Sequence, residues 1–222
     1  MADRKQKKKS ETSKRGLTSI CILGEPDFDK TGEFIDASKA LGVALAARKI
    51  IFVYGGGIHS LRGNAAASHS IKGGKILSIT VEQIEGRLFT LGEELKASSL
   101  PQRKGYMLYN ADAFIALPGG LETLDGIFSI TYWAKLNFHQ KPLGLLNVNG
   151  FYDSLLFFLD LAVEKGFIHQ ATRNCIISAS TADELIDRLQ AYAPQQNPFG
   201  EQVGGQSSNS SQKPGPDTTL RL

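Results

Sequence analysis

Residues 111–135, ADAFIALPGGLETLDGIFSITYWAK, constrain the fold of this chain more than any other segment. An apolar run at residues 114–117 is typical of a buried strand, and Pro118-Gly119-Gly120 then forms a tight turn. We expect Thr123 to cap the amphipathic helix that follows. Because a helix N-terminus offers free N–H groups and a positive dipole end, this strand–turn–helix unit predicts a phosphate site.

A second glycine cluster, Gly55-Gly56-Gly57, follows the apolar strand-like run IIFVY at residues 50–54. Consecutive glycines let the backbone approach a ligand closely or adopt positive φ, although one such turn alone is more often ordinary loop chemistry. In a parallel sheet the two glycine turns would share one crevice at the carboxyl ends of the strands. Arg103 and Lys104, just before a predicted helix at residues 105–110, would bring cations to it.

Strand and helix patterns alternate along the middle of the chain. This alternation predicts an α/β fold with one Rossmann-like parallel sheet covered by helices on both faces. The expected strands are residues 19–23, 50–54, 75–81, 113–117 and 142–147, with a further apolar run at 175–177, and the expected helices are residues 32–48, 64–71, 124–136, 152–165 and 181–192.

The composition fits a single domain between two polar ends. With 222 residues, of which 41% are hydrophobic and 21% charged, the chain can bury a full core. We expect a domain at residues 18–193, a disordered basic segment at 1–17 and a disordered tail rich in Gln, Gly, Ser, Asn and Pro at 194–222. The basic run at residues 5–9 favours a solvated tail over nucleic-acid contact or an import signal. We therefore expect no nucleic-acid partner.

The cysteines and histidines indicate neither a disulfide framework nor a metal site. Cys21 and Cys175 lie in separate strand-like segments, where a free thiol behaves as a small buried hydrophobe. No secretory leader or membrane span is evident, so we expect a cytoplasmic protein without a membrane partner, with the nucleus as an alternative. The four histidines have no metal-ligand spacing and are expected to be solvated: His59, His69, His139 and His169.

Several segments, taken together and in order, resemble the Lonely Guy family of cytokinin riboside 5′-monophosphate phosphoribohydrolases, and most closely a plant member. They are VYGGGIHSLRG, LPQRKGYM, ADAFIALPGGLETLDG, WAKLNFHQKPLGLLNVNGFYDSLL and EKGFI, and the likeness extends over residues 19–189. The resemblance implies a Rossmann-like homodimer that hydrolyses the N-glycosidic bond of an N6-modified adenosine 5′-monophosphate. The products would be a free cytokinin base and ribose 5-phosphate, and no cofactor or metal would be needed.

The resemblance also implies which residues of this chain form the site. Arg103 matches the family's active-site arginine and Lys104 the lysine beside it. The family's phosphate-binding positions are retained here as Gly55, Gly56, Gly57, Gly119, Gly120 and Thr123. Trp133, one helix beyond the motif, is expected at a dimer interface in preference to stacking on adenine.

This sequence departs from the family's patterns where chemistry is expected. In PGGxGTxxE, Glu122 stands at the third glycine and Gly126 at the glutamate. In the family's GGGxxGLMG, Ser60 replaces a glycine and Arg62 replaces a methionine. Pro101 stands where the family usually has a histidine. After the first strand, this chain has Leu23-Gly24-Glu25 where the family has Cys-Gly-Ser.

These departures leave three functions open. Glu122 lies one helical turn before Gly126, so it is a candidate relocated catalytic carboxylate, although its charge would also repel a phosphate. Asp125 should point away from the position that Gly126 leaves empty. The alternatives are an enzyme of low efficiency, an inactive nucleotide-binding paralogue, and a heteromeric partner of active relatives.

Overall fold

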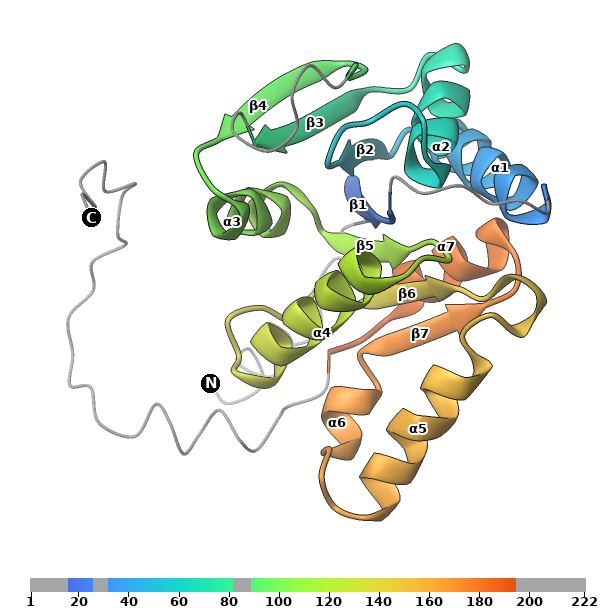
Figure 1. Ribbon diagram of the computed structural model, residues 1–222. Coiled ribbons are helices and arrows are strands. Elements are labelled where there is room, and N and C mark those ends of the chain that lie inside the picture. The colour runs from blue at the N-terminus through green and yellow to red at the C-terminus, as the bar shows by residue number, and fades with distance from the viewer. Residues whose placement is uncertain (1–15, 26–31, 82–88, 195–222) are drawn as a thin grey trace, which may run out of the picture.

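Seven parallel strands form a single sheet in the computed structural model, which describes residues 16–25, 32–81 and 89–194 (Figure 1). The strand order is β4-β3-β2-β1-β5-β6-β7, and every neighbouring pair is parallel. This confirms the expected Rossmann-like α/β fold. The strands are Ser19–Leu23 (β1), Ile51–Tyr54 (β2), Ile76–Val81 (β3), Glu93–Ala97 (β4), Ala113–Ala116 (β5), Leu143–Leu146 (β6) and Ile176–Ala179 (β7).

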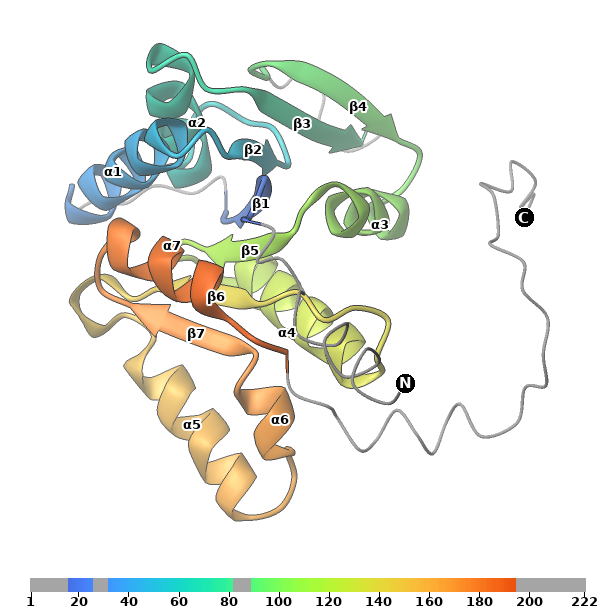
Figure 2. The same ribbon diagram turned by 180° about the vertical axis from the view of Figure 1, so that it is seen from behind.

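Helices cover both faces of the sheet, as Figures 1 and 2 show from opposite sides. On one face, α1, α2 and α7 pack a core that includes Leu41, Ala65 and Leu185. On the other face, α3, α4 and α5 pack a core that includes Met107 and Ile127. The helices are Glu33–Ala47 (α1), Leu61–Ile71 (α2), Leu100–Asn110 (α3), Leu121–Lys135 (α4), Asp153–Glu164 (α5), Gln170–Arg173 (α6) and Ala182–Ala191 (α7), with a 3₁₀ turn at Val148–Gly150 (η1).

The strand order places a ligand crevice beside β1. The chain adds β2, β3 and β4 on one side of β1 and then returns to place β5 on the other side. Ile22 pairs with Tyr54 of β2, and Leu23 pairs with Ala116 of β5, so the three strands end close together. Ligands of such sheets bind where the order reverses, outside the carboxyl ends of the strands. Both glycine turns therefore lie at this edge of the sheet.

One strand has no counterpart in the sequence-based prediction. β4, with the sequence EELKA, forms the edge of the sheet and pairs only with β3. Its residues are mostly exposed, so it lacks the apolar run that marks the central strands. Charged side chains are common on edge strands because they discourage pairing with another chain.

Three predicted helix starts were wrong, and the first is that of α2, which begins at Leu61 instead of residue 64. α3 begins at Leu100 after the N-cap Ser99, whose side chain accepts a hydrogen bond from the Gln102 N–H at 3.3 Å. Arg103 and Lys104 thus lie inside α3. α4 begins at Leu121 after Gly120, so Thr123 does not cap it and instead lies buried in its first turn. Gly120, the last residue of the predicted turn, is the N-cap of α4, and no side chain caps the helix.

The expectation of solvated histidines was wrong for His69 and His139. His69 is fully buried, with Nδ1 3.1 Å from the Gly42 oxygen and Nε2 3.1 Å from the Lys75 oxygen. His139 Nε2 lies 3.0 Å from the Ile130 oxygen. Its Nδ1 accepts a hydrogen bond from the Lys141 N–H at 3.1 Å. Burial lowers the pKa of both imidazoles, because it disfavours the charged form of the ring. His59 and His169 are exposed, as expected.

Both cysteines are free and buried, as predicted. Burial raises the pKa of Cys21 to about 12 and that of Cys175 to about 11, which keeps both as inert thiols. Cys175 directly precedes β7.

No helix in the described ranges has both the length and the apolarity needed to cross a bilayer. Most of the predicted terminal segments at 1–17 and 194–222, including the basic run at residues 5–9, lies outside the described residues.

Candidate functional site

A cavity of about 500 Å³ opens at the carboxyl ends of the strands, between α3 and α4. Its polar wall includes Arg62 from α2, Arg103 from α3 and Glu122 from α4. Its apolar wall includes Met107 and Trp133. The cavity therefore combines a charged end with an apolar side, which suits a ligand with an anionic group and a flat organic ring.

Arg103 is held rigidly at the charged end of the cavity. Only 6% of the residue is exposed. Its Nη2 donates to the Gly55 oxygen at 2.9 Å, and its Nε donates to the Ile79 oxygen at 3.0 Å. A Cβ on Gly55 would lie 1.7 Å from Arg103 Nη2, so a glycine is required there to admit the guanidinium. A carbonyl of β3 and a carbonyl of the turn after β2 thus hold Arg103 at the crevice.

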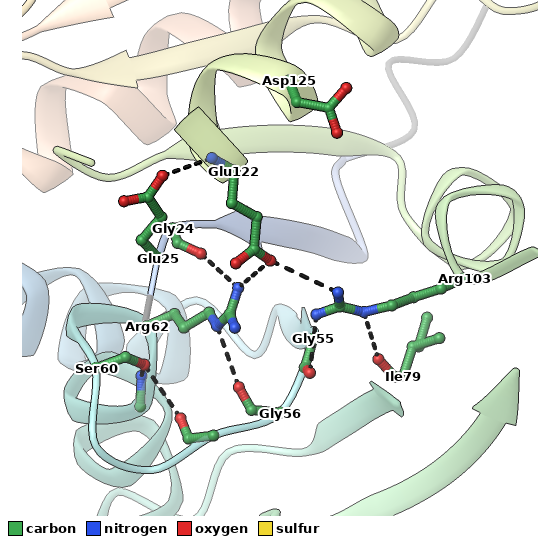
Figure 3. Close-up of polar contacts among 12 residues, drawn as sticks. Gly24, Glu25, Gly55, Gly56, Ser60, Arg62, Ile79, Arg103, Glu122 and Asp125 are labelled. Carbon is green, nitrogen blue, oxygen red and sulfur yellow. Dashed lines mark hydrogen bonds and ion pairs between the residues drawn. The ribbon is translucent and has the colours of Figure 1, made fainter. Parts of the chain in front are cut away.

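Arg62 is a second buried guanidinium in the same cluster (Figure 3). It is 4% exposed, its Nε donates to the Gly56 oxygen at 3.1 Å, and its Nη1 donates to the Gly24 oxygen. Gly56 and Gly57 adopt φ of 82° and 81°, the left-handed region that favours glycine. The predicted glycine cluster therefore orients both arginines through its carbonyls and its unusual backbone. In the sequence, Arg62 stands out because it replaces a methionine of the family's motif.

Glu122 turns toward the two arginines instead of projecting into solvent (Figure 3). Its Oε1 accepts a hydrogen bond from Arg62 Nη1 at 2.9 Å and lies 3.6 Å from Arg103 Nη1. The side chain is 42% exposed, so solvent still reaches this carboxylate. The structure thus brings together Arg103, which matches the family's active-site arginine, and Glu122, the candidate catalytic carboxylate.

Lys104 lies in the cavity wall but is paired with α4. Its Nζ is 2.6 Å from Asp125 Oδ2 and donates to Ser129 Oγ at 3.1 Å. Asp125 consequently points away from the arginine cluster (Figure 3). This ion pair links the two helices that flank the cavity.

Gly126 leaves a space that Leu23 occupies. A Cβ on Gly126 would lie 3.1 Å from Leu23 Cδ1 and 3.4 Å from Cδ2. The loss of a side chain on α4 is therefore matched by a larger side chain at the end of β1. Leu23 and Gly126 both line the cavity.

The predicted phosphate turn is covered by a carboxylate from the loop after β1. Glu25 Oε1 accepts the Glu122 N–H at 2.5 Å, at the start of α4 (Figure 3). Thr123 in the same turn is fully buried, and its Oγ1 has no hydrogen-bond partner among the described residues. Gly119, Gly120 and Thr123 do not line the cavity. Sequence reasoning missed Glu25, although its substitution for a serine was a signal.

The residues of the site include no evident metal centre. Within residues 16–25, 32–81 and 89–194, no group of three His, Cys, Asp or Glu side chains is arranged to hold a metal ion. Trp133, which we expected at a dimer interface, is among the residues that line the cavity.

Comparison with known proteins decides the family. The family model described as "Possible lysine decarboxylase" matches residues 63–189, more than half of the chain. The Arabidopsis thaliana cytokinin riboside 5′-monophosphate phosphoribohydrolase LOG3 is 42% identical over 178 residues, which cover 79% of this chain and 83% of the relative. The chain belongs to the Lonely Guy family.

Other plant Lonely Guy proteins are similar over comparable lengths. Arabidopsis LOG7 is 39% identical over 188 residues, covering 83% of this chain and 87% of the relative. The probable rice enzyme LOGL2 is 40% identical over 179 residues, covering 79% and 73%. This similarity confirms the resemblance drawn from the motifs.

Solved structures support the fold of this Lonely Guy protein. The molybdenum cofactor binding protein of Rippkaea orientalis matches with a TM-score of 0.60 at 18% identity, covering 78% of this chain and 95% of that one. The Chlamydomonas Moco carrier protein matches with a TM-score of 0.58 at 16% identity, covering 78% and 95%. At such identities the likeness concerns the fold alone.

Proposed function

We propose that this protein is a phosphoribohydrolase that converts N6-modified adenosine 5′-monophosphate into a free cytokinin base and ribose 5-phosphate. The observation that carries the proposal is the pairing of Glu122 with Arg103 and Arg62 in the wall of a cavity at the carboxyl ends of β1 and β2. Plant relatives about 40% identical over most of the chain bear the name of this activity.

The reaction requires a carboxylate close to the sugar. The C1′–N bond breaks through an oxocarbenium-like state, the water oxygen bonds to C1′, and a proton passes to the base. A carboxylate stabilises the positive charge on the sugar and activates the water, an effect of about 10²- to 10⁴-fold. We propose that Glu122 supplies this carboxylate from one turn before Gly126, where the family has its glutamate.

Arg103 and Lys104 are proposed to bind the anionic part of the substrate. Arg103 already faces the charged end of the cavity and is fixed by two backbone carbonyls. Lys104 would have to leave Asp125 to reach a phosphate. We place the adenine ring against the apolar wall formed by Met107, Leu100 and Trp133.

A low rate is expected because the Glu122 carboxylate is already engaged by Arg62. The second candidate function, an inactive nucleotide-binding paralogue or a heteromeric partner, is favoured by two observations. Gly126 carries no carboxylate, and Glu25 covers the turn at which a phosphate would bind.

Base release from isopentenyladenosine 5′-monophosphate, measured by chromatography, tests the proposed activity. We expect the parent protein to release free base and Glu122→Gln to lose about 10²-fold in rate. Glu164→Gln is the matched control because Glu164 is an exposed carboxylate of α5, away from the cavity. Absence of base release above the buffer blank by the folded parent protein would favour the inactive paralogue.

We also propose that the protein forms a dimer with itself or with a relative, and that it resides in the cytoplasm or nucleus. Large apolar side chains are exposed on α4 and α5, among them Phe128, Tyr132, Phe157 and Phe158. Exposed apolar surface of this kind is typical of an interaction site.

A further inference from the structure

The start of α4 is already occupied by an anion that belongs to the protein. Glu25 Oε1 accepts the Glu122 N–H at 2.5 Å. A Cβ on Gly120 would lie 2.7 Å from Glu25 Oε2, which places the carboxylate directly against the glycine turn. α4 has 15 residues, so its N-terminus carries the full positive end of a helix dipole. Glu25 thus lies where this turn would bind a phosphate oxygen.

Thr123 provides an independent indication that the turn is built for a polar ligand. The residue is fully buried, and its Oγ1 has no hydrogen-bond partner among the described residues. A Cβ on Gly119 would lie 2.2 Å from this hydroxyl oxygen, so the hydroxyl faces the turn. A buried hydroxyl without a partner is unfavourable, and a phosphate oxygen on the turn would satisfy it. Glu25 leaves it unsatisfied.

The position of Glu25 follows from the sheet topology. β1 and β5 are neighbours, and Leu23 pairs with Ala116, so the residues after Leu23 run beside the turn after β5. The Gly24 carbonyl accepts from Arg62, which fixes the backbone directly before Glu25. The cavity wall includes Gly24 and Glu122 but none of Gly119, Gly120 or Thr123. Glu25 therefore lies at the boundary between the cavity and the turn.

We propose that Glu25 is a specificity-determining residue that competes with the substrate 5′-phosphate for the start of α4. A carboxylate and a phosphate cannot share the same N–H donor at this distance, and their like charges repel. Phosphate binding therefore requires Glu25 to leave. This inference rests on the proposed function, because it takes a nucleoside 5′-monophosphate as the ligand. Its consequence is that the parent protein discriminates little between the monophosphate and the free nucleoside.

Calorimetric titration with AMP and with adenosine tests this role without any turnover. We expect Glu25→Ser to bind AMP about tenfold more tightly than the parent does, which corresponds to about 1.4 kcal/mol. Its affinity for adenosine should change by less than about twofold. Glu25→Gln keeps the size of the side chain but removes its charge, so it should give part of the gain. Glu93→Gln is the control because it removes an exposed charge at the start of the edge strand β4.

A further substitution locates the gained phosphate contact. Adding Thr123→Val to Glu25→Ser should remove most of the gain for AMP and leave adenosine binding unchanged. Inorganic phosphate should compete with AMP in Glu25→Ser more strongly than in the parent. Circular dichroism melting establishes that each variant is folded.

Several results would overturn the proposal. One is a ratio of AMP affinity to adenosine affinity that is the same in both folded Glu25 variants as in the parent protein. Another is an equal gain in affinity for both ligands, and a third is the absence of AMP binding by either variant. The failure of the proposed function is a different result, because an inactive parent can still show the shift in binding ratio. Conversely, the parent protein could release free base while the ratio of AMP affinity to adenosine affinity stays unchanged in the Glu25 variants. That result would support the proposed function and exclude this role of Glu25.

Discussion

At the scale of single residues, four departures of this chain from its family's motifs form two contacting pairs. Glu122 contacts Arg62 at 2.9 Å, and both stand where relatives of this family are expected to have uncharged residues. Leu23 fills the space beside Gly126. Each substitution is stabilised by its partner, because an unpaired buried guanidinium or an empty space in the cavity wall would destabilise the fold. Reverting one member alone therefore disturbs the site.

The Leu23–Gly126 pair gives a prediction about restoring the missing carboxylate. Gly126→Glu alone should lower stability by about 1 kcal/mol, because crowding against Leu23 outweighs the gain in helix propensity. Gly126→Glu combined with Leu23→Ala should relieve the crowding and raise kcat by about 10²-fold. Thermal melting and base release measure the two effects.

Leu23→Ala alone is the control for that experiment, since it enlarges the cavity without adding a carboxylate. A folded double variant with the parent's kcat would show that the missing glutamate does not limit the rate.

At the scale of elements, the helices on the α1–α2 face depend on very close backbone approach. A Cβ on Gly42 of α1 would lie 2.1 Å from the backbone oxygen of Ala65 in α2 and 3.1 Å from the backbone nitrogen of His69. The ring nitrogen Nδ1 of His69 in turn lies 3.1 Å from the Gly42 oxygen. α2 begins after the N-cap Ser60, whose side chain accepts a hydrogen bond from the Gly63 N–H at 3.0 Å, and this helix carries Arg62 into the site. The packing of α1 on α2 thus fixes the position of a site residue.

Two identical substitutions in different helices should therefore have opposite effects on stability. Gly42→Ala should destabilise the protein by about 2 kcal/mol or more, because the clash involves backbone atoms that cannot rotate away. Gly105→Ala lies on an exposed part of α3 with no atom within 4 Å of the new Cβ. It should stabilise by about 0.5–1 kcal/mol through helix propensity.

Urea denaturation of both variants measures these changes in the free energy of unfolding. Equal effects of the two substitutions would contradict the close packing of α1 against α2.

At the scale of the whole molecule, α4 and α5 both expose large aromatic side chains. Phe128 and Tyr132 lie four residues apart on α4 and are 43% and 55% exposed. Phe157 and Phe158 of α5 are 71% and 57% exposed. α6 contacts both of these helices, so the two groups belong to neighbouring elements (Figure 1). Surface of this kind is typically covered by another protein chain.

We predict that the purified protein is a dimer at micromolar concentration. Phe158→Glu combined with Phe128→Glu should shift it to a monomer, because charged side chains are unfavourable in the core of an interface. Light scattering coupled to size exclusion measures the mass. Ile71→Glu is the matched control because Ile71 is 82% exposed on α2, on the other face of the sheet. A parent protein that is only monomeric would contradict the prediction.

The sequence by itself determined the fold class and much of the site. Strand and helix periodicity, two glycine turns and Arg103 are readable within short segments, because local backbone preference and side-chain spacing encode them. Tertiary structure alone decided that Glu25 covers the turn before Glu122, 97 residues away, and that Arg62 pairs with Glu122, 60 residues away. It likewise decided the burial of His69. Such contacts depend on which strand ends become neighbours, and no local pattern in the chain carries that information.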